Sequence, residues 1–351
     1  MECNEKNQIK IGNIIQFRPD KEYSLSVYAQ LRKATLWAEQ GFVTAKEQFL
    51  LHVRQKGLNS KEAQGLLLQK DSLHLTVLTG ENFEIQLDNH SGALLQITYN
   101  GAKILKDKIE PYFWKPANEN QRRNGYNQRL GVWKDAMSHQ KVHILKKYIK
   151  PDCFSITYQK YLTKADVTIN INYTVNCTGQ IKVRLDYLPK TGKQYPLIPK
   201  IGMHFRTDSV FNNIVWYGRG PQENYPDRKT GSLLGIYSKQ LHDFITPYVV
   251  PQDNSNRSDV RWCSFLDKSG KGIKVSSAQP FCFRAWPYSE NDLETTAHNY
   301  QLPTRDYINI NIDSRIHGVG GNDSWGAKTL DAYSINANTP YQFTISIEPQ
   351  Q

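Results

Sequence analysis

The sequence contains little cysteine and no paired cysteine motif. Five cysteines, an odd number, are spread widely over its 351 residues: Cys3, Cys153, Cys177, Cys263 and Cys282. Without a CxxC pair, neither a zinc site nor a thiol–disulfide redox motif is predicted. The isolated histidines His204, His298 and His317 also lack HExxH or another metal-ligand spacing. We therefore expect reduced core thiols, structural histidines and no metal site in this chain.

Long apolar runs are missing as well. No stretch approaches the ~18 apolar residues of a membrane span, and the polar N-terminus lacks the apolar core of a secretory signal. We expect a soluble, cytoplasmic protein that has no membrane partner. A periplasmic location stays open if the chain is part of a longer secreted protein.

Acidic residues are in the minority. The 44 Lys and Arg residues exceed the 33 Asp and Glu residues, which gives a formal net charge of +11. A nucleic-acid-binding protein concentrates such an excess in one stripe. Here the basic residues are spread along the chain, so the charge is typical of a solvated surface and nucleic acid is not predicted as a partner.

Helical periodicity is scarce, whereas period-two alternation is frequent. Apolar residues alternate cleanly from Val167 to Val175 and again from Ile181 to Tyr187, on either side of a Cys-Thr-Gly turn. Similar runs begin at Leu73, Phe83 and Leu95. Hairpin-spaced strands without alternating helices predict an all-β protein, built as a large antiparallel β-sandwich.

One domain boundary is visible near the N-terminus. Residues 23–51 show a strand–loop–strand pattern, and the polar stretch 54–70 contains two glycines and suits a linker. We predict a partial β-sandwich in residues 1–55, a linker in 56–70 and the main domain in 71–351. Two or three strands cannot cover their own apolar face. The first unit should therefore dock on the main domain or be completed by another chain.

The carboxylates Glu223 and Asp227 are the best candidates for an acid–base pair. Glycoside hydrolysis needs two such groups facing each other across the scissile bond. However, Arg219 and Arg228 flank them, and an arginine–carboxylate network that fixes a loop explains the same residues. We interpret all four as a structural loop network and predict no catalytic residue here. A second acidic group, Glu290 to Glu294, is interpreted as a solvated loop.

From about residue 190 the chain has long irregular segments that carry Trp216, Trp262, Trp286 and Trp325, and binding residues often lie on such loops. The sharpest loop, residues 317–325, has three glycines, which allow a close backbone approach to a ligand. Its later positions favour a tight turn that would present Trp325, whose flat indole can stack on a pyranose. A buried tryptophan plugging the sandwich end remains the structural alternative. The supporting loop residues are Gly320, Gly321, Asn322 and Asp323.

Three long motifs follow one another in the second half of the chain: YGRGPQENYPDR (217–228), TPYVVPQDN (246–254) and GVGGNDSW (318–325). In order and spacing they resemble the C-terminal domain of the glycoside hydrolase family 2 β-galactosidases. Upstream, residues 113–120 and 129–133 are similar to the segment that leads into that domain. Residues 34–41 resemble the end of the preceding immunoglobulin-like domain. The resemblance therefore runs from about residue 8 to the C-terminus.

The resemblance implies a galactose mutarotase-like supersandwich preceded by part of an immunoglobulin-like sandwich. In that family the acid/base and nucleophile glutamates and the magnesium ligands lie in a (β/α)₈ barrel that this chain lacks. It implies retaining hydrolysis of β-D-galactosides such as lactose by the whole enzyme, with the barrel on a large chain or an N-terminal portion. No cofactor is then expected in this chain, which alone should be inactive. The family's C-terminal domain contributes one tryptophan that stacks on the leaving-group sugar, and Trp325 matches it.

This chain departs from the family pattern in two places. Where the family has a TDND-like run, it has Ala117-Asn118-Glu119-Asn120, so no role of that acidity carries over. The immunoglobulin-like domain is cut short, as in enzymes encoded as two chains, although a C-terminal piece of a longer gene is equally compatible. Self-association stays open.

Two other functions remain beside the main one. The first is a carbohydrate-binding module acting alone. The second is an aldose 1-epimerase-like mutarotase, which needs a histidine and a carboxylate that converge in the concavity of the sandwich.

Overall fold

The computed structural model describes residues 16–52, 65, 67–323 and 325–350. The chain divides into two compact units, Met1–Ser60 and Lys61–Gln351. Most of the predicted linker lies outside the described residues, and its last residues already belong to β3 (Leu68–Asp71). Residues 60–68, the stretch whose sequence most favours a short helix, also lie mainly outside the described residues.

The first unit contains one antiparallel hairpin of β1 (Tyr23–Gln30) and β2 (Val43–His52). Apolar side chains occupy both of its faces, because Val27 and Phe49 lie on one and Tyr28 and Leu50 on the other. All four are between 43 and 50 % exposed. Among the described residues this unit therefore has no core of its own, as expected for so few strands.

The second unit consists mainly of antiparallel strands. They are β3 and β4 (Leu75–Thr79), β5 (Phe83–Asp88), β6 (Ala93–Tyr99), β7 (Ala102–Lys103), β8 (Leu105–Tyr112), β9 (Gln140–Lys150), β10 (Cys153–Leu162), β11 (Val167–Asn176), β12 (Ile181–Leu188), β13 (Lys200–Asp208), β14 (Asn213–Gly220), β15 (Leu233–Gln240), β16 (Arg257–Leu266), β17 (Gly272–Trp286), β18 (Tyr307–Ile316) and β19 (Tyr341–Gln350). The prediction of an all-β, antiparallel fold is confirmed.

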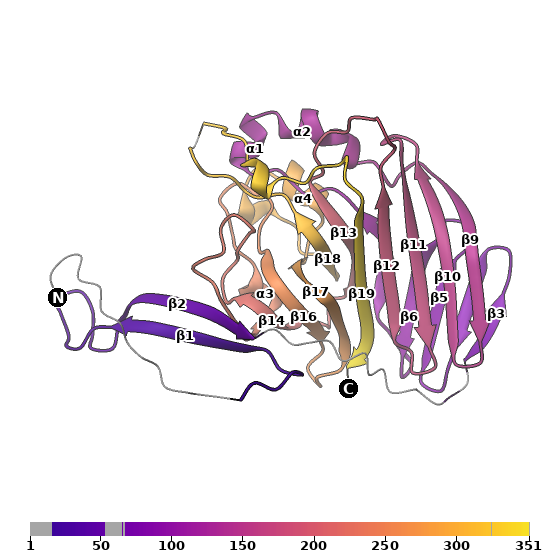
Figure 1. Cartoon of the computed structure of the whole chain (residues 1–351), viewed down its shortest axis with the longest axis horizontal. Coiled ribbons are helices and arrows are strands. Elements are labelled where there is room, and N and C mark those ends of the chain that lie inside the picture. Colours follow the sequence, from indigo (N-terminus) through magenta and orange to yellow (C-terminus); the bar gives the residue numbers. More distant parts are fainter. Residues whose placement is uncertain (1–15, 53–64, 66, 324, 351) are drawn as a thin grey trace. The chain divides into compact units, whose positions relative to one another are not determined.

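The strands form a curled sheet system with two branches that share the long strand β17 (Figure 1). The first half of β17 pairs with β19, which continues through β12 and β11 to β10 and β9. The second half pairs with β18, which leads through β13 to β8. One strand therefore belongs to both branches and joins them.

The inner faces of the two branches meet in a single hydrophobic core. Along β11 every second side chain is buried, which is the alternation expected from the sequence. Tyr158 and Tyr173, from β10 and β11, donate hydrogen bonds to Asn89 and to the carbonyl of Gly92 at the turn between β5 and β6. A Cβ at Gly92 would lie 2.8 Å from the Tyr158 ring, so the turn packs directly on the opposite branch.

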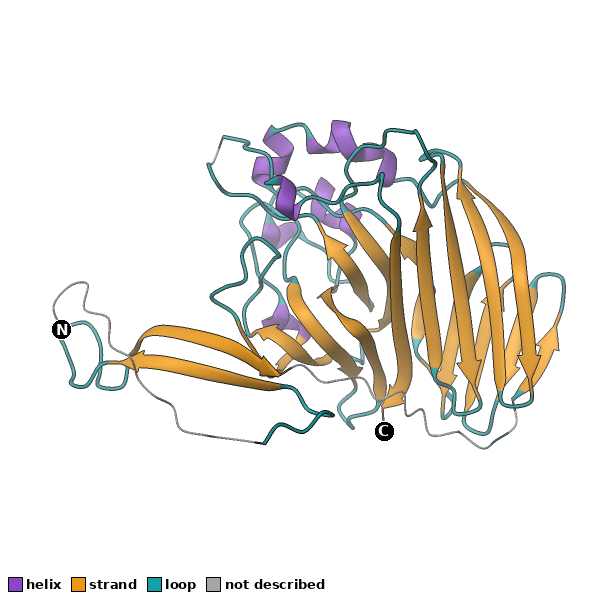
Figure 2. Ribbon diagram, viewed as in Figure 1, coloured by secondary structure: helices purple, strands orange, loops and turns teal. Residues whose placement is uncertain are grey.

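Short helices gather mainly at one end of the strands (Figure 2). The α-helices are α1 (Glu119–Arg123), α2 (Tyr126–Leu130), α3 (Leu241–Phe244) and α4 (Glu290–Thr295), and the 3₁₀ turns are Gly131–Trp133, Asn299–Gln301 and Asp331–Tyr333. Three of the tryptophans expected on loops lie instead in strands: Trp216 in β14, Trp262 in β16 and Trp286 in β17. Trp216 and Trp286 are fully buried, whereas Trp325 is 80 % exposed.

Substitution of Ile171 by alanine should lower the free energy of unfolding by roughly 2–5 kcal/mol, because Ile171 is fully buried in the core face of β11. Thr168→Ala changes the outward face of the same strand and should cost less than about 0.5 kcal/mol. Urea unfolding of both variants measures the difference. Equal losses would mean that the faces of β11 are not assigned correctly.

Candidate functional site

A pocket of about 300 Å³ opens beside the N-terminus of α1. Residues 118–120 and 319–321 line it, together with Tyr225, Arg228, Tyr248, Gln252 and Asp253. Segments far apart in the sequence thus meet at the glycine-rich loop, residues 317–327, of which Ser324 is not described. The pocket is lined by amide, carboxylate, tyrosine and arginine groups, which are chemically suited to a polar ligand such as a sugar.

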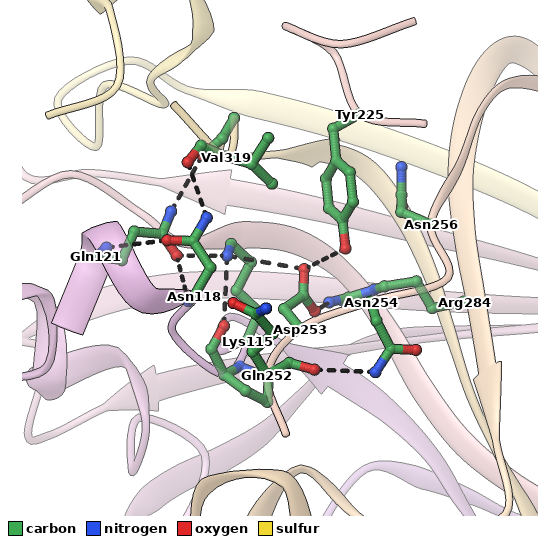
Figure 3. Close-up of polar contacts among 12 residues, drawn as sticks. Lys115, Asn118, Gln121, Tyr225, Gln252, Asp253, Asn254, Asn256, Arg284 and Val319 are labelled. Carbon is green, nitrogen blue, oxygen red and sulfur yellow. Dashed lines mark hydrogen bonds and ion pairs between the residues drawn. The ribbon is translucent and has the colours of Figure 1, made fainter. Parts of the chain in front are cut away.

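The floor of the pocket rests on a network of buried charges (Figure 3). Asp253 lies 3.7 Å from the Lys115 ammonium, pairs with Arg284 and accepts a 2.9 Å hydrogen bond from the Tyr225 hydroxyl. Arg284 also pairs with Asp313 at 2.9 Å, and Asp313 with Lys200 at 2.7 Å. The charged side chains of this network are fully buried.

Burial has a clear electrostatic effect on the two lysines. It lowers the pKa of Lys115, against the attraction of Asp253, and lowers the pKa of Lys200 to about 8, against that of Asp313. The neighbouring carboxylates therefore have to hold these ammonium groups in their charged form. The network is a structural support for the pocket, since its ion pairs join distant segments of the chain, although among the described residues the Arg284 Nε has no hydrogen-bond partner.

Glu223 is held by three donors and is nearly buried. It accepts hydrogen bonds from Arg228 at 2.5 Å, from the Ser255 amide at 2.6 Å and from the Tyr248 hydroxyl. These hydrogen bonds occupy both carboxylate oxygens and hold Glu223 in a fixed position. Glu223 and Arg228 thus brace the rim of the pocket.

Asp227, unlike Glu223, binds the backbone of the glycine-rich loop. Its two carboxylate oxygens accept hydrogen bonds from the backbone amides of Val319 at 3.0 Å and Gly320 at 2.8 Å. A Cβ at Gly318 would lie 2.5 Å from the same carboxylate, so only glycine permits this approach. Arg219 joins neither carboxylate of the proposed loop network, because it pairs with Asp259 at 2.5 Å.

The glycine-rich loop presents Trp325 at the surface. Gly320 and Gly321 have positive φ angles of 73° and 119°, which other residues rarely adopt. Asp323 accepts hydrogen bonds from the backbone amides of Trp325 at 2.9 Å and Ala327 at 3.0 Å, which closes the turn. The 80 % exposure of the indole contradicts a plug buried in the sandwich end.

The expectation that residues 290–294 form a solvated acidic loop is wrong. Glu290 and Asp292 are buried in α4; Asn309 and Asn311 each donate to Glu290 at 2.9 Å. Although burial opposes it, the nearby His204 and these two amides lower the pKa of Glu290 to about 2. The sequence pattern could not reveal this, because the partners lie in β13 and β18.

His204 and Glu290 do converge, with 3.8 Å between the imidazole and the carboxylate. A histidine and a carboxylate that converge in this way are what the mutarotase hypothesis requires. Glu290 is poorly suited to act as a general base, because its oxygens are occupied by two amides and its low pKa makes it a weak proton acceptor.

Two negative findings concern the described residues alone. Within residues 16–52, 65, 67–323 and 325–350, no group of three or more histidine, cysteine or acidic side chains could hold a metal ion. None of the helices in this part of the chain is long and apolar enough to cross a membrane.

Comparison with known proteins gives a consistent result. Residues 79–347 match the family model described as the β-galactosidase small chain. The β-galactosidase of Priestia megaterium is 32 % identical over 93 % of this chain and 32 % of its own length. The β-galactosidase small subunit of Latilactobacillus sakei is 26 % identical over 77 % of this chain and 94 % of its own. This chain thus spans about a third of the length of the full-size relatives.

The chain also aligns with solved structures described as mutarotase-like or as aldose epimerase homologues. A galactose mutarotase-like protein from Lactobacillus casei aligns with a TM-score of 0.44 and 10 % identity, over 81 % of this chain and 99 % of its own. The GalM/aldose epimerase homologue from C. elegans aligns with a TM-score of 0.42 and 12 % identity, over 82 % and 99 %.

His317, at the base of the glycine-rich loop, should make the chain sensitive to mild acid. Burial, followed by the charges of Lys115 and Arg129, lowers its pKa to about 3. An unfolded histidine has a pKa of about 6.5, so between these values the unfolded chain binds the additional proton and stability falls as the pH falls.

His317→Gln should therefore remove on the order of 2 kcal/mol from the stability lost between pH 7.5 and pH 5. Urea unfolding of parent and variant at both pH values measures it. An identical loss in the two proteins would show that His317 is not kept neutral by the fold.

Proposed function

This chain belongs to the β-galactosidase small-chain family, and from this premise we propose that it completes the active-site mouth of a β-galactosidase. The whole enzyme would hydrolyse terminal β-D-galactosides such as lactose, with retention at the anomeric carbon. A large chain or an N-terminal portion would carry the barrel with the catalytic glutamates and the magnesium site.

The carboxylates around the pocket support this division of labour. Retaining hydrolysis needs an acid/base and a nucleophile about 5–5.5 Å apart, both accessible to the substrate. Glu223 is instead saturated by three donors, Asp227 by two backbone amides, and Asp253 by a buried ion pair. These three carboxylates therefore have structural roles, and the catalytic acid/base and nucleophile would come from the large chain or the N-terminal portion.

The observation that carries the proposal is the exposed indole of Trp325 on a loop that is fixed from several sides. Tryptophan offers a large, rigid and apolar face, and it loses little conformational freedom when a sugar ring stacks on it. We assign Trp325 the leaving-group sugar, while the barrel would hold the galactosyl unit.

The β1–β2 hairpin supports a second part of the proposal, contact with the large chain. Both of its faces carry exposed apolar side chains, and an isolated two-stranded sheet is marginally stable in water. We propose that strands of the large chain cover these faces and complete the immunoglobulin-like sandwich. The mutarotase alternative has less support, because both carboxylate oxygens of Glu290 accept hydrogen bonds from asparagine side chains.

The purified chain alone should not hydrolyse lactose or a nitrophenyl galactoside above background. The carboxylates of Glu223, Asp227 and Asp253 are occupied, and the exposed pocket residue Glu119 alone does not make the pair of carboxyl groups that the reaction needs. Spectrophotometric assays of the pure chain test this, with Glu223→Gln as the companion variant. Turnover that disappears in Glu223→Gln would contradict the proposal, whereas activity that appears on addition of a barrel-bearing large chain supports it.

In the reconstituted enzyme, Trp325→Ala should weaken binding of the leaving-group sugar by on the order of 1–3 kcal/mol, or about ten- to a hundredfold. Galactosyl transfer to added glucose should suffer more than hydrolysis of an aryl galactoside, whose leaving group needs no second sugar site. Kinetics on both substrates measure the difference.

Tyr300→Ala is the matched control, because Tyr300 is an aromatic residue of nearly the same exposure outside the loop. It should leave both reactions unaffected. Equal losses on both substrates in Trp325→Ala, with a lowered melting temperature, would assign the indole a structural role.

A further inference from the structure

Two asparagine side chains connect the glycine-rich loop to the start of α1. The Asn118 amide nitrogen donates to the carbonyl of Val319 at 2.8 Å, and that of Asn120 donates to the carbonyl of Asp323 at 2.7 Å. These bonds span about 200 residues of sequence. They hold the loop at two points, one before the turn and one within it.

The orientation of the Asn118 amide follows from its other contact. Its oxygen caps α1 by accepting a 2.9 Å hydrogen bond from the Gln121 backbone amide, which completes a capping box. The nitrogen must therefore face Val319. Asn120 likewise meets a carbonyl oxygen, which can only accept, so its donor group has to point there.

The loop also packs closely on the other end of α1. A Cβ at Gly326 would lie 3.1 Å from the Arg123 side chain and 3.4 Å from its backbone. The Arg123 guanidinium lies 5.9 Å from the centre of the Trp325 ring, within the range of a cation–π contact. One surface of the indole thus faces a cation on the helix that also supplies the asparagines.

We propose that Asn118 and Asn120 are positioning residues, whose amide groups latch the glycine-rich loop onto α1 and thereby set the direction of the Trp325 indole. The consequence for sugar binding rests on the function proposed above. The latch itself is a property of this chain alone.

An amide is required for this latch. Aspartate has the same size and shape as asparagine, but its ionised carboxylate has no hydrogen to donate. At either position it would face a carbonyl oxygen with a negatively charged oxygen. The segment Ala117-Asn118-Glu119-Asn120 therefore suits the loop better than an aspartate-rich run would, given the contacts seen here.

The first experiment measures the mobility of the indole in the full chain. With ¹⁵N-labelled tryptophan, the Trp325 indole signal is identified by its loss in Trp325→Phe. Asn120→Asp should clearly reduce the heteronuclear NOE of that signal, and Asn118→Asp should do so as well. Melting curves confirm that the variants remain folded.

Asn127→Asp is the matched control, because Asn127 is an exposed asparagine in the adjacent helix α2 and undergoes the same chemical change. It should leave the indole signal as in the parent chain. An indole equally ordered in Asn120→Asp, Asn118→Asp and Asn127→Asp would overturn the proposal. If Asn118→Asp alone fails to fold, Asn120→Asp decides the question.

The second experiment uses the enzyme reconstituted with a large chain. Asn120→Asp should raise the apparent KM for glucose as the acceptor roughly three- to tenfold, as expected for the loss of one hydrogen bond, and should affect aryl galactoside hydrolysis less. If Asn120→Asp loosens the indole but Trp325→Ala leaves acceptor transfer intact, the latch is supported and the leaving-group role of Trp325 fails. If only Trp325→Ala impairs transfer and the NOE is unchanged, the latch fails.

Discussion

The buried charge network under the pocket is the constraint on which the site depends. Lys115, Asp253 and Arg284, continued by Asp313 and Lys200, are removed from water and linked by ion pairs, each carboxylate between two cations. Loss of one partner from such a pair typically costs about 3–5 kcal/mol, because the other charge stays buried and unpaired. The five residues come from separate segments of the chain. We infer that the network selects the one arrangement in which all of these segments meet.

A continuous set of contacts leads from this network to the surface. The Lys115 ammonium donates to the side-chain oxygen of Gln121 at 2.9 Å. The side-chain amide nitrogen of Gln121 in turn donates to the carbonyl of Gly318 at 3.1 Å. From Gly318 the loop runs past Asp227 to Trp325. Because hydrogen bonds already constrain the loop, a ligand that stacks on the indole has less ordering entropy to overcome.

The two units of the chain contrast in how complete they are. In the main unit, the pocket, its supporting charges and the loop with Trp325 all come from this chain. The β1–β2 hairpin, in contrast, exposes apolar side chains on both faces. This contrast fits the proposed role of the chain as one part of a larger enzyme, and the chain spans about a third of the length of its full-size relatives.

The sequence by itself determined the features that depend on neighbours along the chain. Period-two alternation predicted the strand pairs around Gly179 and the all-β class, since a strand exposes alternate residues to opposite faces. The glycines before Trp325 likewise located the loop, because positive φ angles are a local requirement.

Only the tertiary structure decided which polar groups meet. Glu290, which the sequence predicted to be solvated, is buried, and Trp216, which was expected on a loop, lies in the core. Arg219 pairs with Asp259. Asn120 and Asp323 are 203 residues apart, and nothing local to either predicts their hydrogen bond. Such contacts arise when sheet pairing and core burial bring distant segments together. The sequence around Trp325 therefore does not reveal the long-range hydrogen bonds that orient its indole.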